Sequence, residues 1–470
     1  MGEGTTIRSM NGLSIRQLME LRQKIIEGPV PVEPEEYRDR QSRFVAEISE
    51  RSLAIFPTNP TRIRSRDVEY IHRPSSDLVY LCGWTESEGI LAALVDDQGG
   101  ATWHLFVAPQ DIAKEIWTGR RTGPKEAQRT HPIDTAHPLD KWDEWVKEAI
   151  LNSSQVYHVL GIHPSLDNLI HSAMAEETRE RQRLDTGPRQ LVDPRNIISE
   201  LRLKKSESEI AIMRYAGEIT ALAHIEAMRQ SHSGIGEWQL EAIIEGHFRY
   251  LGADGWAYPS IVGGGDRATI LHYQKNDQII EAGEMVLIDA GCEVNCYASD
   301  ITRTWPIDGT FSDRARDLYS LVLEAQEQAI DACVIGAPYT RPHEVASDVL
   351  REGLIQLGLI TSDDEEESQR QLKRFFMHNT SHWLGLDVHD VGTYQPEEEP
   401  RLLEEGMVLT IEPGLYIAGW RSDLSDVDDA WKGLGIRIED DIHVTSGGPD
   451  ILSNDCPKTI DEIEAIVGSG

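Results

Sequence analysis

Residues 285–305 have the sequence MVLIDAGCEVNCYASDITRTW. The two ends of this stretch predict strands at 285–290 and 299–305, with a glycine in the connection between them. Asp289 belongs to the first strand and Asp300 to the second. Because a hairpin places its two strands side by side, both carboxylates can reach one point. An acidic side chain in each of two apolar strands therefore indicates a site.

The same feature occurs again late in the chain. Glu412 lies within the predicted strand 408–416, in the run VLTIEP, and Glu439 lies within the predicted strand 435–444, in the run IRIED. A buried carboxylate without a partner is costly, so it must be protonated, paired or bound to a metal ion. A single such acid is usually part of a structural ion pair. Four of them need four positive charges, which two divalent cations supply if one neutral histidine also ligates.

Three histidines lie within the segment 378–389, HNTSHWLGLDVH. Their spacing beside Gly385 is typical of a site loop rather than of a core segment. Oxygen-rich ligation with one imidazole favours Mn²⁺, with Co²⁺ or Zn²⁺ as alternatives. Two such ions can hold and deprotonate a bridging water at neutral pH. The sequence therefore predicts a centre of two divalent metal ions.

The two halves of the chain differ in pattern. Up to about Pro194, short apolar runs separated by polar, Gly or Pro breaks are mixed with helical patterns, which predicts an α/β domain. The second half opens with a capping box at 206–209, SESE. Helix, helix and then acid-bearing strands occur there twice, which indicates a pseudo-symmetric domain of two half-units.

The composition argues against several partners. Acidic residues outnumber basic ones 80 to 45, so the net charge is −35, and this disfavours nucleic acids and anionic membrane surfaces. The five cysteines form no C-x-x-C pair, and neither a signal peptide nor an apolar membrane span is recognisable. We therefore expect a cytoplasmic protein. The acid excess also suits a salty cytoplasm, a hypothesis that stability falling with rising salt would contradict.

These segments, in their order along the chain, resemble the dinuclear metallopeptidases of the pita-bread fold, and among them the aminopeptidase P family. The matching segments are 75–83, 115–121, 270–273, 287–292, 297–304, 378–390, 409–414 and 435–441. The resemblance implies an α/β, ribonuclease H-like domain with an N-terminal extension over 1–195 and an α+β pita-bread catalytic domain over 196–470. It also implies release of the N-terminal residue from peptides with proline at the second position.

The resemblance assigns the metal ligands residue by residue. They would be Asp289, Asp300, His382, Glu412 and Glu439. Asp300 and Glu439 would bridge the two ions, and a hydroxide between the ions would attack the scissile carbonyl. Glu412 would orient that nucleophile and carry its proton to the leaving proline nitrogen.

Other residues are expected to contact the substrate or to act in catalysis. His389 would hydrogen-bond the developing oxyanion or the substrate carbonyl, and His272 and His378 would bind the proline end. Arg437 would tether a nearby acid, and Tyr416 would lie near the site. The roles of the three histidines are implied by the resemblance. Those of Arg437 and Tyr416 follow from their spacing, two residues before Glu439 and four after Glu412, which places them on the strand face of those acids.

Trp117 resembles a family residue that reaches the pocket of a neighbouring subunit, which implies a homo-oligomer, a dimer or a tetramer. Two positions depart from the family pattern. Asn379 stands where glycine usually follows the first histidine of the loop, and asparagine tolerates the left-handed conformation better than most residues. The acidic run 397–399 stands where family members can carry an arginine.

Three alternatives remain. A prolidase would take only Xaa-Pro dipeptides, and segments 115–117 and 387–392 favour aminopeptidase P instead. Creatinase-like hydrolases keep the fold without the full metal ligand set, which is complete here. Non-catalytic pita-bread domains bind peptides or chromatin after losing the ligands, and the charge of −35 argues against chromatin.

Overall fold

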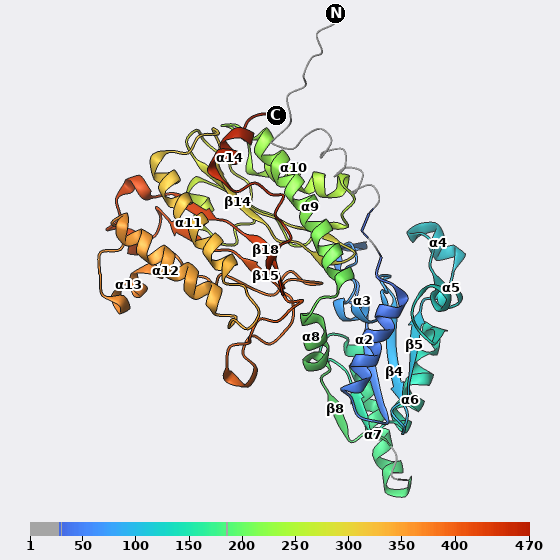
Figure 1. Cartoon of the computed structure of the whole chain (residues 1–470). Coiled ribbons are helices and arrows are strands. Elements are labelled where there is room, and N and C mark those ends of the chain that lie inside the picture. Colours follow the sequence, from blue (N-terminus) through green and yellow to red (C-terminus); the bar gives the residue numbers. More distant parts are fainter. Residues whose placement is uncertain (1–27, 30, 185–186) are drawn as a thin grey trace, which may run out of the picture. The chain divides into compact units, whose positions relative to one another are not determined.

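The computed structural model describes residues 28–29, 31–184 and 187–470, which divide into two compact units, Val32–Arg202 and Leu203–Gly470 (Figure 1). The division falls near the end of helix α8 (Arg195–Leu203), whereas the boundary expected at 195–196 coincides with the start of that helix. The expected N-terminal extension lies outside the described residues for positions 1–27. No helix in the described part of the chain is long and apolar enough to span a membrane.

The first unit is built on a six-stranded sheet with the order β6-β5-β4-β1-β7-β8. The central strand β1 pairs antiparallel with β4 and parallel with β7, so the sheet is mixed. Its strands are β1 (Ser52–Pro57), β4 (Gly89–Val95), β5 (Ala101–Val107), β6 (Thr135–Pro138), β7 (Gln155–Tyr157) and β8 (Gln190–Val192), beside a small hairpin of β2 (Ile63–Ser65) and β3 (Val68–Glu69). The helices that precede α8 are α2 (Pro34–Ala46), α3 (Ser76–Cys82), α4 (Ile112–Thr118), α5 (Gly123–Thr130), α6 (Trp142–Asn152) and α7 (Pro164–Leu184).

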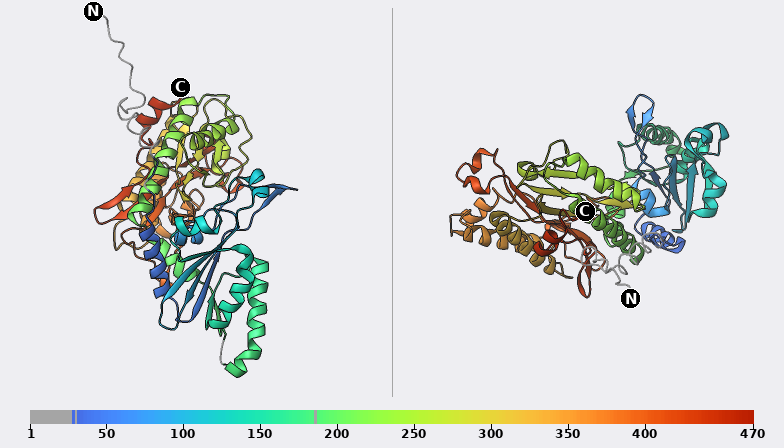
Figure 2. Two further views of the ribbon diagram at one scale, coloured as in Figure 1. Left: turned by 90° about the vertical axis from the view of Figure 1, so that its right-hand side faces the viewer. Right: turned by 90° about the horizontal axis from the view of Figure 1, so that it is seen from above.

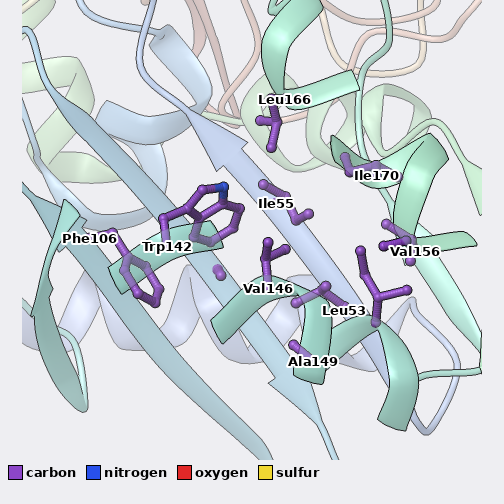
Figure 3. Packing of buried hydrophobic residues seen from close by; sticks show 12 residues of the cluster. Leu53, Ile55, Phe106, Trp142, Val146, Ala149, Val156, Leu166 and Ile170 are labelled. Carbon is purple, nitrogen blue, oxygen red and sulfur yellow. The ribbon is translucent and has the colours of Figure 1, made fainter. Parts of the chain in front are cut away.

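Helices α6 and α7 cover one face of this sheet (Figure 3). Leu53 and Ile55 lie two positions apart on β1, so both side chains point to the same face, where they meet Val146 of α6 and Ile170 of α7. The Trp142 ring packs edge-on against Phe106, with ring centroids 4.9 Å apart. This aromatic and aliphatic cluster is the main core of the first unit.

In the second unit, long helices pack in pairs on the outside of the strands (Figures 1 and 2). Ser206 and Glu209 form the predicted capping box, which fixes the start of α9 because each side chain accepts a hydrogen bond from the other's backbone N–H. The helices are α9 (Glu207–Gln230), α10 (Glu237–Tyr250), α11 (Asp313–Asp331), α12 (Arg341–Gln356), α13 (Glu365–Leu372) and α14 (Ile460–Ile466).

The hairpin predicted from residues 285–305 is confirmed. Strand β11 (Met285–Asp289) pairs antiparallel with β14 (Thr302–Pro306), in a register that places Asp289 opposite Thr302. The connection forms the short strands β12 (Cys292–Val294) and β13 (Tyr297–Ala298), which pair with each other and with β9 (Gly255–Trp256). Gly291 starts this connection, and any β-carbon there would lie 1.8 Å from the Ser299 carbonyl oxygen. Only glycine permits the two chains to approach so closely.

The prediction that Glu412 and Glu439 lie inside continuous strands was wrong. Each marks a break: Glu412 follows β15 (Val408–Ile411) and Glu439 precedes β18 (Asp440–Thr445). The chain changes partner at both breaks, because β15 pairs with β18 whereas the following strand β16 (Gly414–Ile417) pairs with β17 (Leu434–Arg437). Strand β10 (Ile261–Gly264) extends the β11–β14 sheet, β19 (Gly448–Ile451) extends the β15–β18 sheet, and an isolated bridge between Thr302 and Glu439 joins the half-units.

Candidate metal centre

All five residues assigned as ligands line one cavity of about 370 Å³ in the second unit. Each acid is placed by a strand end: Asp289 closes β11, Asp300 lies just before β14, and Glu412 and Glu439 occupy the two breaks. At the end of a strand the backbone is no longer held by hydrogen bonds to the neighbouring strand, so the side chain can turn into the cavity. Other lining residues are Tyr258, Ile261, Leu271, His272, Gln274, His378, Asn379, Val388, His389 and Arg437.

Asp300, His382 and Glu439 form the tightest group. One potential ligand atom from each lies within 4.8 Å of the others. The Nε2 atom of His382 is 3.5 Å from Asp300 Oδ2 and 3.8 Å from Glu412 Oε1. The other ring nitrogen, Nδ1, lies 3.0 Å from the Trp383 carbonyl oxygen, to which it donates when it carries the proton. When the ring is neutral, that tautomer directs the Nε2 lone pair at the acids, as a metal-ligating histidine requires. Burial lowers the pKa of His382, but Asp300 and Glu412 outweigh this and raise it to about 9, so a metal ion at Nε2 would displace a proton.

Burial and mutual repulsion raise the pKa values of the carboxylates in this group. Burial raises the pKa of Asp300 and of Glu439, and the charges of neighbouring carboxylates raise both further. Burial also raises the pKa of Glu412, to about 7, although His382 and Arg437 act in the opposite direction. The cavity therefore disfavours the ionised forms of Asp300, Glu412 and Glu439 until positive charge is added.

Asp440, the neighbour of Glu439 in the chain, provides the contrast. Its carboxylate lies 2.7 Å from Arg303 and 2.8 Å from Lys458, and all three residues lie away from the cavity lining. Burial alone would raise the pKa of Asp440, but the two cations hold it at about 2. Asp440 is thus a structural ion-pair acid, whereas Glu439 forms no ion pair in the described part of the chain and faces the cavity.

A hydrogen-bonded network behind the acids fixes their orientation. Arg437 Nη2 donates to Asp289 Oδ2 at 2.6 Å, and its other nitrogens lie 3.0 Å from the Tyr416 hydroxyl and 3.2 Å from Thr302 Oγ1. The Thr302 hydroxyl donates to Glu439 Oε2 at 2.6 Å. One arginine therefore positions acids from both half-units, Asp289 directly and Glu439 through Thr302. Within the described residues it is also the only arginine that lines this cavity.

We expect Thr302→Val to weaken metal binding by roughly 10- to 100-fold, because Glu439 loses its hydrogen-bond donor and Arg437 loses an acceptor. The measurement is a metal-binding isotherm on the metal-free protein. Thr269→Val is the matched control, since Thr269 is also buried but its hydroxyl donates to the Asp266 carbonyl. Equal affinities for the two variants would show that Thr302 does not position the acids.

Histidines surround the acids. His378 Nε2 lies 2.8 Å from the Tyr416 hydroxyl, and its Nδ1 is 3.8 Å from Glu412 Oε2. The His389 ring packs edge-on against His382, with centroids 4.5 Å apart. Burial lowers the pKa of His389 and lowers that of His378 to about 3, so both rings are neutral at pH 7. His272 lines the cavity from an exposed position.

Comparison with known proteins agrees with this geometry. The family model of metallopeptidase family M24 matches residues 211–446, and that of the aminopeptidase P N-terminal domain matches residues 37–157. The Xaa-Pro aminopeptidase of Escherichia coli is 39% identical over 437 residues, which cover 92% of this chain and 97% of that protein. This chain belongs to metallopeptidase family M24.

Solved structures confirm the predicted fold class, an α/β N-terminal domain followed by a pita-bread catalytic domain. The aminopeptidase PepP of Pseudomonas aeruginosa superimposes with a TM-score of 0.88 at 41% identity, covering 93% of this chain and 98% of that chain. Proline aminopeptidase P II of Yersinia pestis gives the same TM-score at 40% identity, with 93% and 99% covered. The resemblance to aminopeptidase P is thereby confirmed.

An M24 metallopeptidase uses divalent metal ions, and the donor set here fits them. Four carboxylates and one imidazole with its Nε2 directed inward converge on one cavity, and Arg437 pairs with one of the carboxylates, Asp289. Carboxylates with a single imidazole are the ligands of harder divalent ions. All five residues assigned from the sequence line this cavity, and Asp300, His382 and Glu439 form the group with the closest ligand atoms.

Tyr258 is a site residue of this M24 chain that sequence reasoning missed. Its hydroxyl lies 2.7 Å from Asp289 Oδ1 and also contacts Asp300, so it links the two acids of the hairpin. A lone tyrosine before β10 carries no distinguishing pattern, and only the fold brings it to the acids. Thr302 was missed for a related reason, because a threonine in a strand is ordinary.

Two predicted residues, Tyr416 and Trp117, lie apart from the cavity lining. Tyr416 is fully buried one hydrogen bond behind His378. Trp117 belongs to α4 of the first unit, where its side chain is 86% exposed. Asn379 lines the cavity, but its φ is not positive, so the left-handed conformation considered for it is not adopted.

Proposed function

We propose that this chain is an Xaa-Pro aminopeptidase, which releases the N-terminal residue from peptides with proline at the second position. The convergence of four acids and His382 in one cavity, within a chain that carries both the M24 and the aminopeptidase P N-terminal domains, is the observation that carries this proposal. The curated relatives named Xaa-Pro aminopeptidase match over nearly the whole chain.

We propose that two ions bind at this centre, Mn²⁺ foremost and Co²⁺ or Zn²⁺ as alternatives, through Asp289, Asp300, His382, Glu412 and Glu439. When bound, divalent ions lower the pKa of water and polarise a carbonyl oxygen. The mixture of carboxylate oxygens with one imidazole supports the preference for Mn²⁺.

The chain's own side chains supply the proton transfers and hydrogen bonds. Glu412 faces the cavity 3.8 Å from both His378 and His382, where its carboxylate can take a proton and deliver it to the leaving proline nitrogen. That nitrogen carries no hydrogen in the Xaa-Pro bond and must gain one as the bond breaks. Neutral His389 offers an N–H to the carbonyl oxygen as negative charge develops on it.

The test is hydrolysis of Ala-Pro-Ala, with Ala-Ala-Ala and the dipeptide Ala-Pro as comparison substrates. The proposal requires release of alanine from Ala-Pro-Ala, and little or no cleavage of Ala-Ala-Ala. Cleavage of Ala-Pro alone would identify a prolidase instead. A metal-loaded protein inert towards all three peptides would support a peptide-binding protein without catalysis.

We expect His389→Ala to lower kcat by roughly 10- to 100-fold and to change KM by a smaller factor. The contact strengthens only as charge develops on the carbonyl oxygen, so its loss raises the barrier more than it weakens substrate binding. Steady-state kinetics on Ala-Pro-Ala measure both constants, with His343→Ala as a control outside the lining of this cavity. A pure KM effect would assign His389 to binding alone.

We propose that the chain forms a homo-oligomer, a dimer or a tetramer, in which α4 meets a second copy. Ile112, Ile116 and Trp117 are 78%, 76% and 86% exposed, and all lie on this one short helix. Large apolar side chains gathered on an exposed helix are typical of an interface. A second copy is the occupant favoured here because Trp117 is the residue expected to reach a neighbouring subunit.

We expect Trp117→Ala to lower both the particle mass measured by sedimentation and the peptidase activity on Ala-Pro-Ala. Ile71→Ala is the control, because Ile71 is 98% exposed in the same unit but lies outside α4. An unchanged mass for Trp117→Ala, combined with unchanged activity, would remove Trp117 from both the interface and the site.

We also propose a cytoplasmic location, with peptides rather than nucleic acids or membranes as partners. All five cysteines are free and buried, which suits a reducing compartment. The net charge of −35 repels nucleic acids and anionic membranes. Cell fractionation with an antibody against the chain tests the location.

A further inference from the structure

The first unit holds a cavity of about 490 Å³ that the proposed peptidase chemistry does not use. It opens at the C-terminal end of β1, where Pro57 ends the strand, and between the starts of β4, α6 and α7. Every lining residue falls between Pro57 and Ser172, inside the first unit. Its volume is within the range of small-molecule sites.

An unpartnered donor lies in its wall. The Trp142 side chain lines the cavity and is 4% exposed, yet its indole Nε1–H has no acceptor among the residues that the structure describes. Figure 3 shows this nitrogen on the side of the ring that faces Leu166, which also lines the cavity. A buried N–H group without an acceptor is costly, so this one is available to donate to an oxygen of a ligand in the cavity.

A second source of donors lies beside the indole. Helix α7 begins at Pro164, and Ser165 and Leu166 of its first turn line the cavity. The first N–H groups of a helix have no acceptor within it, and the helix dipole adds partial positive charge at this end. The indole and the helix start therefore favour a carboxylate.

The cavity also has carboxylates in its lining, which can face a positively charged group of a ligand. Glu88 and Asp143 line the cavity, while none of its lining residues is a lysine or an arginine. Glu88 Oε2 lies 3.0 Å from Arg121, so Glu88 is partly compensated, whereas Asp143 forms no ion pair within the described residues. Two carboxylates without a lining cation favour an ammonium group. Ile90, Leu139, Leu166 and Leu169 supply an apolar wall.

We propose that this cavity binds a small zwitterion with an apolar side chain, namely a free α-amino acid or a short peptide. Its carboxylate would accept from Trp142 Nε1–H and the start of α7, its ammonium would face Asp143 and Glu88, and its side chain would pack on the apolar wall. This site is separate from the metal centre, and the inference does not depend on the proposed peptidase activity.

The experiment is isothermal titration of the full chain with L-leucine and, separately, with L-leucyl-L-leucine. An Asp300→Ala, metal-free background prevents either compound from binding through metal ions. We expect saturable binding of at least one, and the stronger of the two identifies the class of ligand. L-Leucinamide lacks the carboxylate and N-acetyl-L-leucine lacks the ammonium, so each should bind at least tenfold more weakly than L-leucine.

Two variants test whether the ligand binds in this cavity. Trp142→Phe keeps the ring and removes the N–H, so affinity should fall about five- to tenfold, and Leu169→Trp should fill the cavity and abolish binding. Trp145→Phe is the matched control, since Trp145 packs beside Trp142 without lining the cavity. The proposal would be overturned if neither compound gave a saturable heat signal. It would also be overturned if both cavity variants kept a native circular dichroism spectrum and bound the ligand with unchanged affinity.

Discussion

Replacing Asp300 with alanine is expected to lower kcat/KM for Ala-Pro-Ala by more than about a hundredfold and to lower the bound metal content. Asp300 lies just before β14, with its carboxylate 3.5 Å from His382 Nε2 and in contact with Tyr258. Without it, the group that it forms with His382 and Glu439 loses one of three donors. Peptide kinetics combined with elemental analysis of the same preparation measure both effects.

Stability measurements separate this role from a structural one. In metal-free protein, Asp300→Asn should melt at a temperature equal to or above that of the unsubstituted chain, because one of the mutually repelling buried carboxylates is removed. In metal-loaded protein, the order should reverse. Asp317→Ala, on the exposed face of α11, is the control and should change neither activity nor metal content. A kcat near the normal value for Asp300→Ala would contradict the ligand assignment.

Complete removal of metal with a chelator is expected to abolish turnover and to lower the melting temperature by several degrees. The cavity gathers four carboxylates with one arginine, so the metal-free folded state carries repulsion that bound ions relieve. Ions that bind only the folded state stabilise it by about 4 kcal/mol at 1,000 times their dissociation constant. Differential scanning calorimetry and the tripeptide assay on one chelated sample measure both effects.

Reloading that sample with Mn²⁺, Co²⁺ or Zn²⁺ in separate experiments should restore both properties, with Mn²⁺ giving the highest activity. Circular dichroism of the chelated sample controls for unfolding. Full activity in protein shown by elemental analysis to be free of metal would favour a metal-free, creatinase-like hydrolase. Restored stability without restored activity would instead indicate a centre that binds ions but does not catalyse.

Local patterns in the sequence were sufficient for several elements of the fold. The hairpin that carries Asp289 and Asp300 was predictable because two apolar runs around a glycine have few other ways to pair. The start of α9 was predictable because a capping box depends only on Ser206 and Glu209, three residues apart. Such features depend on neighbours in the chain and can be recognised without the rest of the fold.

The strands that carry Glu412 and Glu439 show where local pattern was insufficient. Both segments are apolar and look continuous, yet each breaks at its acid because the chain passes from one sheet to another. Pairing between β15 and β18 and between β16 and β17 joins residues far apart in the sequence. Propensity alone cannot reveal such a change of partner.

The amino-acid sequence by itself determined the fold class and the kinds of donor at the centre, because both depend on residue types in a fixed order. Only the tertiary structure decided which acid faces the cavity and which forms a structural ion pair. Glu439 and Asp440 are adjacent in the sequence, but Asp440 turns to Arg303 and Lys458 while Glu439 turns to the cavity, Thr302 and His382. The tertiary structure likewise brought Tyr258 to the centre and placed the Trp142 indole in the wall of a cavity in the first unit. Contacts between distant segments set the charge and partners of each side chain.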